Sequence, residues 1–88
     1  MKTTKSLVAI GYKNKSSYVI WGIGSSKTAA WKDAKWWIRY WCLYMSTSNK
    51  DEIARCRVFS ACLELDEYLL THGGHRVPAK FILHSRKR

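Results

Sequence analysis

The side chains best suited to binding chemistry lie in a basic, aromatic segment near the middle of the chain. Lys32, Lys35 and Arg39 recur every three or four residues, so on a helix they would line one face. Lys27 stands where such a helix would begin, and Trp36 falls among the cations. Lysine and arginine attract phosphates, and an exposed indole can stack on a base or fit a partner's pocket. The pattern predicts a surface that contacts nucleic acid or a nucleoprotein complex.

Three further residues extend this predicted surface. Lys13 and Lys15 lie in a polar stretch between two β-rich segments, and Leu43 continues the helical face as an anchor for a protein partner. Basic residues near both termini could touch phosphates without reading sequence, because nothing fixes their geometry. The alternative explanation is a solvated lysine face with Trp36 covered by another element, such as the C-terminal strand.

Histidines and cysteines offer a second kind of chemistry, metal binding. Five residues separate Cys56 from Cys62, and two separate His72 from His75. Neither spacing matches the short knuckles typical of zinc sites. We therefore expect buried thiols and a histidine at a helix end, with no metal and no cofactor.

Acidic residues offer a third kind, general acid–base catalysis. On a helix the adjacent Asp66 and Glu67 would diverge by about 100°, and Glu64 and Glu67 would form a solvated edge. The sequence also lacks a Ser–His–Asp order, a P-loop and a redox cysteine pair. We expect a non-catalytic binding protein. The acidic helix could instead face the basic helix of a second copy, which would make a homodimer.

The composition bears on the partner. The chain has 88 residues, enough for one domain, and its 47% hydrophobic content is that of a globular protein. Sixteen Lys and Arg against six Asp and Glu give a formal net charge of +10, which favours polyanionic partners. Residues 1–50 hold nine of the basic groups and one acid, Asp33. We expect nucleic acid, or an acidic protein or ribonucleoprotein surface, as the partner.

The cysteines and the N-terminus bear on location. Three cysteines are an odd number without a disulfide framework, which favours a reducing compartment. Only four apolar residues occur in a row before Gly11, too few for a signal-peptide core or a membrane span. We expect a cytoplasmic protein without membrane contact.

The elements that must position the binding residues begin with two strands. Residues 6–12 and 16–23 are β-rich, and the polar residues between them predict a hairpin. Alternation in the second strand would place Tyr18, Ile20 and Gly22 on one face, and Val19, Trp21 and Ile23 on the other. Since both faces carry apolar groups, this strand is expected in the interior of its sheet.

A helix is expected to follow, from the serine pair to about Met45. Gly24 allows a sharp turn, and Ser25 or Ser26 can cap the first helical turn. The face opposite the cations is predicted to form a core stripe of Ala30, Ala34, Trp37, Ile38, Trp41 and Met45.

The second half of the chain allows two interpretations. Residues 51–72 could form one long helix, or a strand at 54–59 followed by a helix from about Ala61 to His72. Period-two alternation around Cys56 favours the strand and helix.

The last elements are a helix stop and a strand. The pair Gly73-Gly74 would end the helix, and residues 80–84 predict a final strand. One domain at 1–88 results, with short flexible basic tails at about 1–5 and 85–88. The order is β-β-α-β-α-β, or β-β-α-α-β. The predicted fold class is α+β, a small sheet with two helices packed on one face.

The segment G-I-G-S-S-K-T-A-A-W-K-D-A-K resembles the junction between the last strand and last helix of double-stranded-RNA-binding domains. The matching positions are Gly22, Gly24, Ser26, Lys27, Ala30 and Ala34. The resemblance implies that Lys27 contacts phosphates across a groove. The same stretch is similar to the strand–helix turn of HicB-like half-RNase-H antitoxins, which would imply an acidic toxin as partner.

A second class of function remains open. In size and in its lack of catalytic residues the chain is similar to phage or mobile-element proteins that inhibit host defence complexes, such as anti-CRISPR proteins. In that case Trp36 and Leu43 would anchor a protein–protein interface, and the lysines would steer association.

Overall fold

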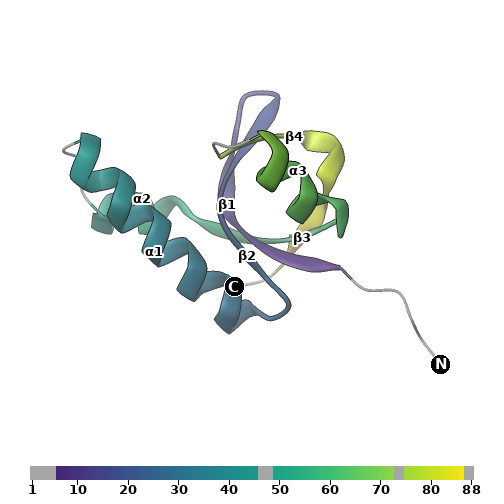
Figure 1. Cartoon of the computed structure of the whole chain (residues 1–88), viewed down its shortest axis with the longest axis horizontal. Helices are drawn as coiled ribbons and strands as arrows, with labels where there is room; N and C mark the ends of the chain where they lie inside the picture. The colour runs from purple at the N-terminus through teal and green to yellow at the C-terminus, as the bar shows by residue number, and fades with distance from the viewer. Residues whose placement is uncertain (1–5, 46–48, 73–74, 87–88) are drawn as a thin grey trace.

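A five-stranded antiparallel sheet and three α-helices make up the described part of the protein (Figure 1). The computed structural model describes residues 6–45, 49–72 and 75–86, without the side chains of residues 43–45 and 84–86. The elements in chain order are β1 (Leu7–Asn14), β2 (Ser17–Gly24), α1 (Lys27–Met45), α2 (Asn49–Arg55), β3 (Arg57–Ala61), α3 (Glu64–His72), β4 (Arg76–Pro78), a 3₁₀ turn η1 (Ala79–Phe81) and β5 (Ile82–Arg86). The strands lie in the order β4-β2-β1-β3-β5. The predicted α+β class is confirmed.

Strands β1 and β2 form the predicted hairpin, with a tighter turn than expected. Asn14 pairs with Ser17, so the loop has two residues, and Lys15 takes a positive φ of 61°. A positive φ at the first loop residue matches the right-handed twist of the two strands. Both strands have close neighbours on either side, β3 beside β1 and β4 beside β2, as predicted for an interior β2.

A bulge at Trp21 changes which residues of β2 share a face. Ile10 pairs with Gly22, but Gly11 pairs with Ile20, so Trp21 is an extra residue on β2. The expected strict alternation is therefore wrong from Gly22 onward. Gly22 faces α1, whereas Ile20 and Ile23 belong to the apolar cluster on the opposite side of the sheet.

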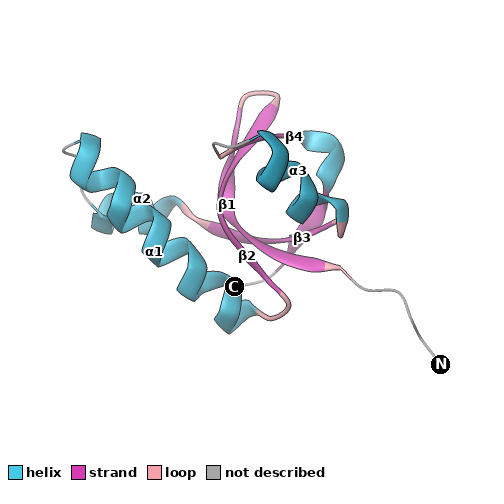
Figure 2. Ribbon diagram, in the orientation of Figure 1, coloured by secondary structure: helices cyan, strands magenta, loops and turns pink. Residues whose placement is uncertain are grey.

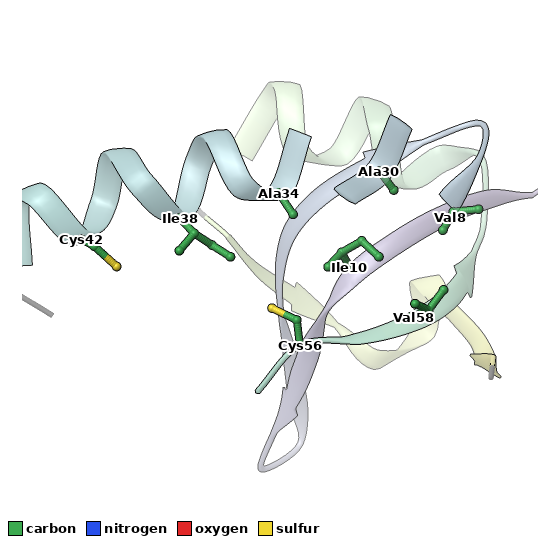
Figure 3. Packing of buried hydrophobic residues seen from close by; sticks show 8 residues of the cluster. All are labelled: Val8, Ile10, Ala30, Ala34, Ile38, Cys42, Cys56 and Val58. Atoms are coloured by element: carbon green, nitrogen blue, oxygen red, sulfur yellow. The ribbon is translucent and has the colours of Figure 1, made fainter. Parts of the chain in front are cut away.

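Helix α1 packs very closely on this strand. A Cβ at Gly22 would lie 2.5 Å from the carbonyl oxygen of Ala30 and 2.6 Å from the Cα of Ala34, so only glycine fits there. Figure 3 shows Ala30, Ala34 and Ile38 reaching from α1 toward Ile10 and its neighbours on the sheet. The glycines before the helix thus allow the helix and strand backbones to approach closely.

The predicted core stripe of α1 is only partly correct. Ala30, Ala34 and Ile38 are fully buried, but Trp37 and Trp41 are half-buried at the edge of the helix. Cys42 takes the next core position. The close approach of α1 leaves no room for an indole in the interface, and the side chain of Met45 lies outside the described residues.

Helix α3 covers the other face of the sheet. Its Leu65 is fully buried against Ala9, Phe59 and Val77. In Figure 2 the strands curve around α3, while α1 and α2 lie outside that curve. The expectation of two helices on one face is therefore wrong, because β1 and β3 are apolar on both sides and each side needs its own cover.

For the second half of the chain, the predicted strand followed by a helix is largely correct, but a short helix precedes the strand. Residues 49–55 form a helix and residues 57–61 a strand, so the predicted strand begins three residues late and a short helix precedes it. The expected helix then starts at Glu64 and ends at His72, where a stop was predicted; the two glycines lie outside the described residues.

The C-terminal strand also differs from its expected range. β5 begins at Ile82, after the 3₁₀ turn, and extends to Arg86. A short strand, β4, pairs with β2 at the sheet's edge, where Pro78 can be accommodated without its amide hydrogen.

Candidate nucleic-acid interface

The candidate interface is built on helix α1, which begins where the sequence predicts. The hydroxyl of Ser26 accepts a hydrogen bond from the Ala29 amide at 3.1 Å, and its carbonyl accepts one from Ala30 at 2.9 Å. Ser26 is therefore the N-cap. The helix then runs without interruption through every residue of the predicted basic and aromatic face.

The outward side of α1 carries the predicted cations. Lys27, Lys32, Lys35 and Arg39 are all exposed. At 100° per residue the last three fall within an arc of about 60°. We call Lys32, Lys35, Trp36, Arg39 and Tyr40 the α1 outer face.

Two stacked aromatic rings lie beside the cations. Trp36 and Tyr40 are 59% and 42% exposed, and their rings are nearly parallel, 3° apart in orientation with centroids 5.8 Å apart. Trp37 meets the edges of both, at 4.8 Å from Trp36 and 6.0 Å from Tyr40. The predicted exposure of Trp36 is confirmed. The alternative, in which another element covers Trp36, does not hold for the described residues.

Lys32 and Lys35 also border an open groove between α1 and α2. The groove has a volume of about 570 Å³ and is floored by Trp31 and Ile53. The Lys35 ammonium lies 6.0 Å from the centre of the Trp31 ring, at the limit of a cation–π contact. An anion in this groove would meet two lysines above an apolar floor.

The hairpin lysines belong to a different region. Lys13 lines a hollow with Arg55 and Arg57, at the far end of the sheet from the start of α1. The Arg55 guanidinium lies 5.3 Å from the centre of the Tyr12 ring. Lys15 is exposed at the hairpin tip. Seven of the predicted binding residues have described side chains, and the structure separates them into two regions, α1 and the hairpin.

A partly buried carboxylate, Glu52, contacts two residues of this second region. The Tyr12 hydroxyl donates a hydrogen bond of 2.8 Å to Glu52, which lies 3.8 Å from Arg55. Burial raises the pKa of Tyr12, and the bond to Glu52 raises it further. The tyrosine therefore stays a neutral donor at physiological pH.

Some predicted contacts fall outside the described residues. The side chain of Leu43 is one of them, as are residues 1–5 and 87–88 of the predicted tails. The backbone of Leu43 belongs to α1.

A pocket lies at the edge of β2, on the other flank of α1. It has a volume of about 290 Å³ and is bounded by α1, β2, α3 and the segment before β4. Its aromatic and acidic side chains are Trp21, Asp33, Trp37, Trp41, Asp66 and His75, and Ile20, Ile23, Leu69 and Leu70 also line it. We call it the edge pocket.

His75 is the central ring of the edge pocket. Its centroid lies 4.4 Å from Trp21, 5.3 Å from Trp37 and 5.9 Å from Trp41. Its Nδ1 lies 3.1 Å from the carbonyl oxygen of Ile20, whose amide donates to the His75 carbonyl at 2.8 Å. Burial lowers the pKa of His75 below its usual 6.5, although the Ile20 contact and the charge of Asp33 act in the opposite direction. The imidazole is therefore neutral at pH 7.

Asp33 hydrogen-bonds to the edge of β2 further along the strand, at Ile23. Its Oδ2 accepts a hydrogen bond from the Ile23 amide at 3.1 Å. Asp33 was noted in the sequence only as a lone acid among cations. Here it ties the helix that carries those cations to the sheet.

The structure also bears on the metal-binding, catalytic and membrane-spanning features considered in the sequence. The described residues bring together no cluster of three or more His, Cys, Asp and Glu side chains suited to a metal ion. Glu64, Asp66 and Glu67 lie in the first turn of α3, exposed to solvent. Within the described parts of the chain, no helix has the length and apolar character that crossing a bilayer requires.

Comparison with known proteins gives no relative. No protein-family model, no curated protein and no solved structure matches this chain.

Sequence reasoning missed three participants of these surfaces. Tyr40 was not included in the predicted binding face, although it follows Trp36 by four residues, the spacing at which helical rings meet. Arg55 and Arg57 were not assigned to a binding surface from the sequence, because their proximity to Lys13 depends on pairing between β1 and β3. That pairing leaves no local signal in the sequence.

Proposed function

We propose that this protein binds single-stranded segments of nucleic acid, alone or within a nucleoprotein complex, through the α1 outer face. The observation that carries the proposal is the exposed, stacked pair Trp36–Tyr40 beside a row of three cations. Flat rings that stay accessible offer a surface on which unpaired bases stack, irrespective of their sequence. The cations beside them are at hand for the phosphates that connect those bases.

The arrangement of the two groups supports a single strand as ligand. On the helix, Trp36 and Tyr40 follow Lys32 at about 40° and 80° around the axis. A strand crossing the helix would place its phosphates over the cations and its bases over the rings. In a duplex the bases are already stacked on one another and are not available to the rings.

Lys27 supports the same proposal at the start of the helix. It is exposed beside the amides of the first turn, whose partial positive charge adds to the attraction for a phosphate. The phosphate-contacting role implied by the resemblance to double-stranded-RNA-binding domains would fall on this residue. The hairpin patch at Lys13 would hold a more distant part of the same ligand.

The first test reverses the charge of the face. A labelled ten-nucleotide single-stranded RNA or DNA should bind the wild type and bind the Lys32→Glu/Lys35→Glu variant at least tenfold more weakly by fluorescence anisotropy. The Lys50→Glu/Lys80→Glu variant changes the net charge equally at exposed positions outside the face and serves as the control. If both variants lose affinity equally, only the overall charge matters and the assigned face is wrong.

Salt dependence counts the phosphate contacts. Four cations on phosphates predict that the logarithm of affinity falls with the logarithm of salt concentration with a slope of about −3, since each contact with a single strand contributes roughly −0.7. Replacing Lys32 and Lys35 by alanine should make the slope shallower by about 1.4.

Trp36→Ala tests stacking directly. Loss of one stacked base costs roughly 1–3 kcal/mol, so affinity for the single strand should fall by a factor of about 5 to 150 while the salt slope stays unchanged. Equal binding of duplex, with no effect of Trp36→Ala, would rule out the stacking role. Absence of nucleic-acid binding at physiological salt would favour the alternative, docking of Trp36 on a protein as proposed for anti-CRISPR-like inhibitors.

A further inference from the structure

We propose that the edge pocket receives one unpaired purine base of the bound strand, and that it prefers guanine. This inference rests on the proposed function, because it assigns a base-specific subsite to the same ligand. Three features carry it: the continuity of the pocket with the α1 outer face, the aromatic lining, and the placement of two carboxylates.

Continuity comes from the shared helix. Around α1 the exposed pair Trp36–Tyr40 is followed by Asp33, Trp37 and Trp41, which line the pocket. Trp37 contacts both exposed rings on one side and His75 on the other. A strand with one base stacked on Trp36 therefore has the pocket within reach of a neighbouring base.

Size and lining favour a single base. The volume of about 290 Å³ lies at the lower end of the range for small-molecule pockets, roughly 300–1,000 Å³. Three indoles and a neutral imidazole offer π-faces and ring edges to a flat aromatic ligand.

The two carboxylates of the pocket determine which hydrogen-bonding pattern of a bound base is favoured. Asp66 and Asp33 are two of the six acids in a chain of net charge +10, and both lie at this pocket. A carboxylate accepts hydrogen bonds only, and Asp33 already uses one oxygen for the Ile23 amide. Asp66 on α3 is therefore the principal acceptor. Guanine offers two adjacent donors, its N1–H and its exocyclic amino group, whereas adenine offers only the amino group beside a ring acceptor.

The experiment compares ten-nucleotide single-stranded RNAs that differ at one base. The probes are decauridine and the same strand with one central guanine, adenine or inosine. We expect the guanine strand to bind about tenfold more tightly than the adenine strand, and inosine, which lacks the exocyclic amino group, to fall between them. Asp66→Asn should abolish most of the guanine preference, and its effect on affinity for decauridine should equal that of Glu67→Gln, which removes the same charge.

A matched control separates the pocket from the charge of α3. Glu67→Gln removes the same charge from the next residue, outside the edge pocket, and should keep the guanine preference. Both positions are exposed, so unchanged circular dichroism is expected for both variants.

The outcomes distinguish this inference from the proposed function. If decauridine binds through Lys32 and Lys35 but guanine gives no gain, or Asp66→Asn keeps the gain, the base subsite is wrong and the proposed function stands. If none of the four strands binds the wild type, the base subsite is wrong, and if single-stranded DNA and a nucleoprotein complex also fail to bind, the proposed function is wrong as well.

Discussion

Helices α1 and α3 cover opposite faces of one sheet in different ways. α1 approaches β2 through Ala30 and Ala34 over a glycine, and its large rings lie at its flanks and outside. α3 packs through large side chains, with Leu65 buried and Tyr68 and Leu69 half-buried against the sheet. Close backbone packing thus displaces aromatic rings to the surface, where they can meet a ligand. None of the five tryptophans belongs to the fully buried core.

The charges of the two helices differ as well. The exposed side of α1 is basic, whereas the first turn of α3 carries Glu64, Asp66 and Glu67. Leu70 on α3 is 80% exposed. The sheet therefore separates a surface suited to phosphates from one that repels them, and the edge pocket lies where the two meet.

The largest expected effect is the loss of stability when a buried side chain of α1 or α3 is removed. It tests whether both helices pack equally firmly on the sheet. Leu65→Ala and Ile38→Ala each remove a fully buried side chain and should each lower the free energy of unfolding by roughly 2–5 kcal/mol. Urea denaturation measures both. A loss below about 0.5 kcal/mol for Leu65→Ala, a cost typical of surface positions, would mean that α3 does not cover the second face.

A smaller effect tests the close approach of α1 alone. Gly22→Ala would place a methyl group against the backbone of Ala30 and Ala34, and overpacking of this kind typically costs roughly 1–3 kcal/mol. Gly24→Ala, whose nearest contacts lie at 2.8 and 2.9 Å, should cost less in the same denaturation experiment. Equal stability of Gly22→Ala and the wild type would contradict the packing described for α1.

The smallest effect concerns the pocket between the helices. His75 has a lowered pKa in the folded protein, so the unfolded state binds more protons at mildly acidic pH. The stability due to neutral His75 is complete above pH 6.5 and is lost as the pH falls through the folded pKa. Melting temperatures at pH 7.5 and 5.0 should differ less in His75→Asn than in the wild type.

Local patterns predicted the parts of the fold that depend on neighbours in the sequence. The hairpin, the cap at Ser26, the extent of α1 and the exposure of Trp36 each follow from a few adjacent residues. The bulge at Trp21 was missed because it depends on how β1 pairs with β2. Helices pack on both faces of the sheet, which is consistent with the apolar residues on both sides of β1. The order of the strands in the sheet has no local signature in the sequence.

The candidate site divides in the same way. The cations of α1 were predictable because one helix carries them at regular spacing. The edge pocket was not, since it joins Asp33, His75 and Asp66 from three segments brought together by the sheet. Long-range pairing decides such a site.

The hydrogen bonds at the edge of β2 also affect the tendency of the protein to aggregate at high concentration. β4 pairs with Ser17 to Val19, and beyond it a histidine ring and a carboxylate occupy backbone groups of Ile20 and Ile23. An unoccupied strand border invites another chain to add to the sheet. Here an incoming strand would first have to displace both side chains, which protects this border against sheet-to-sheet polymerisation.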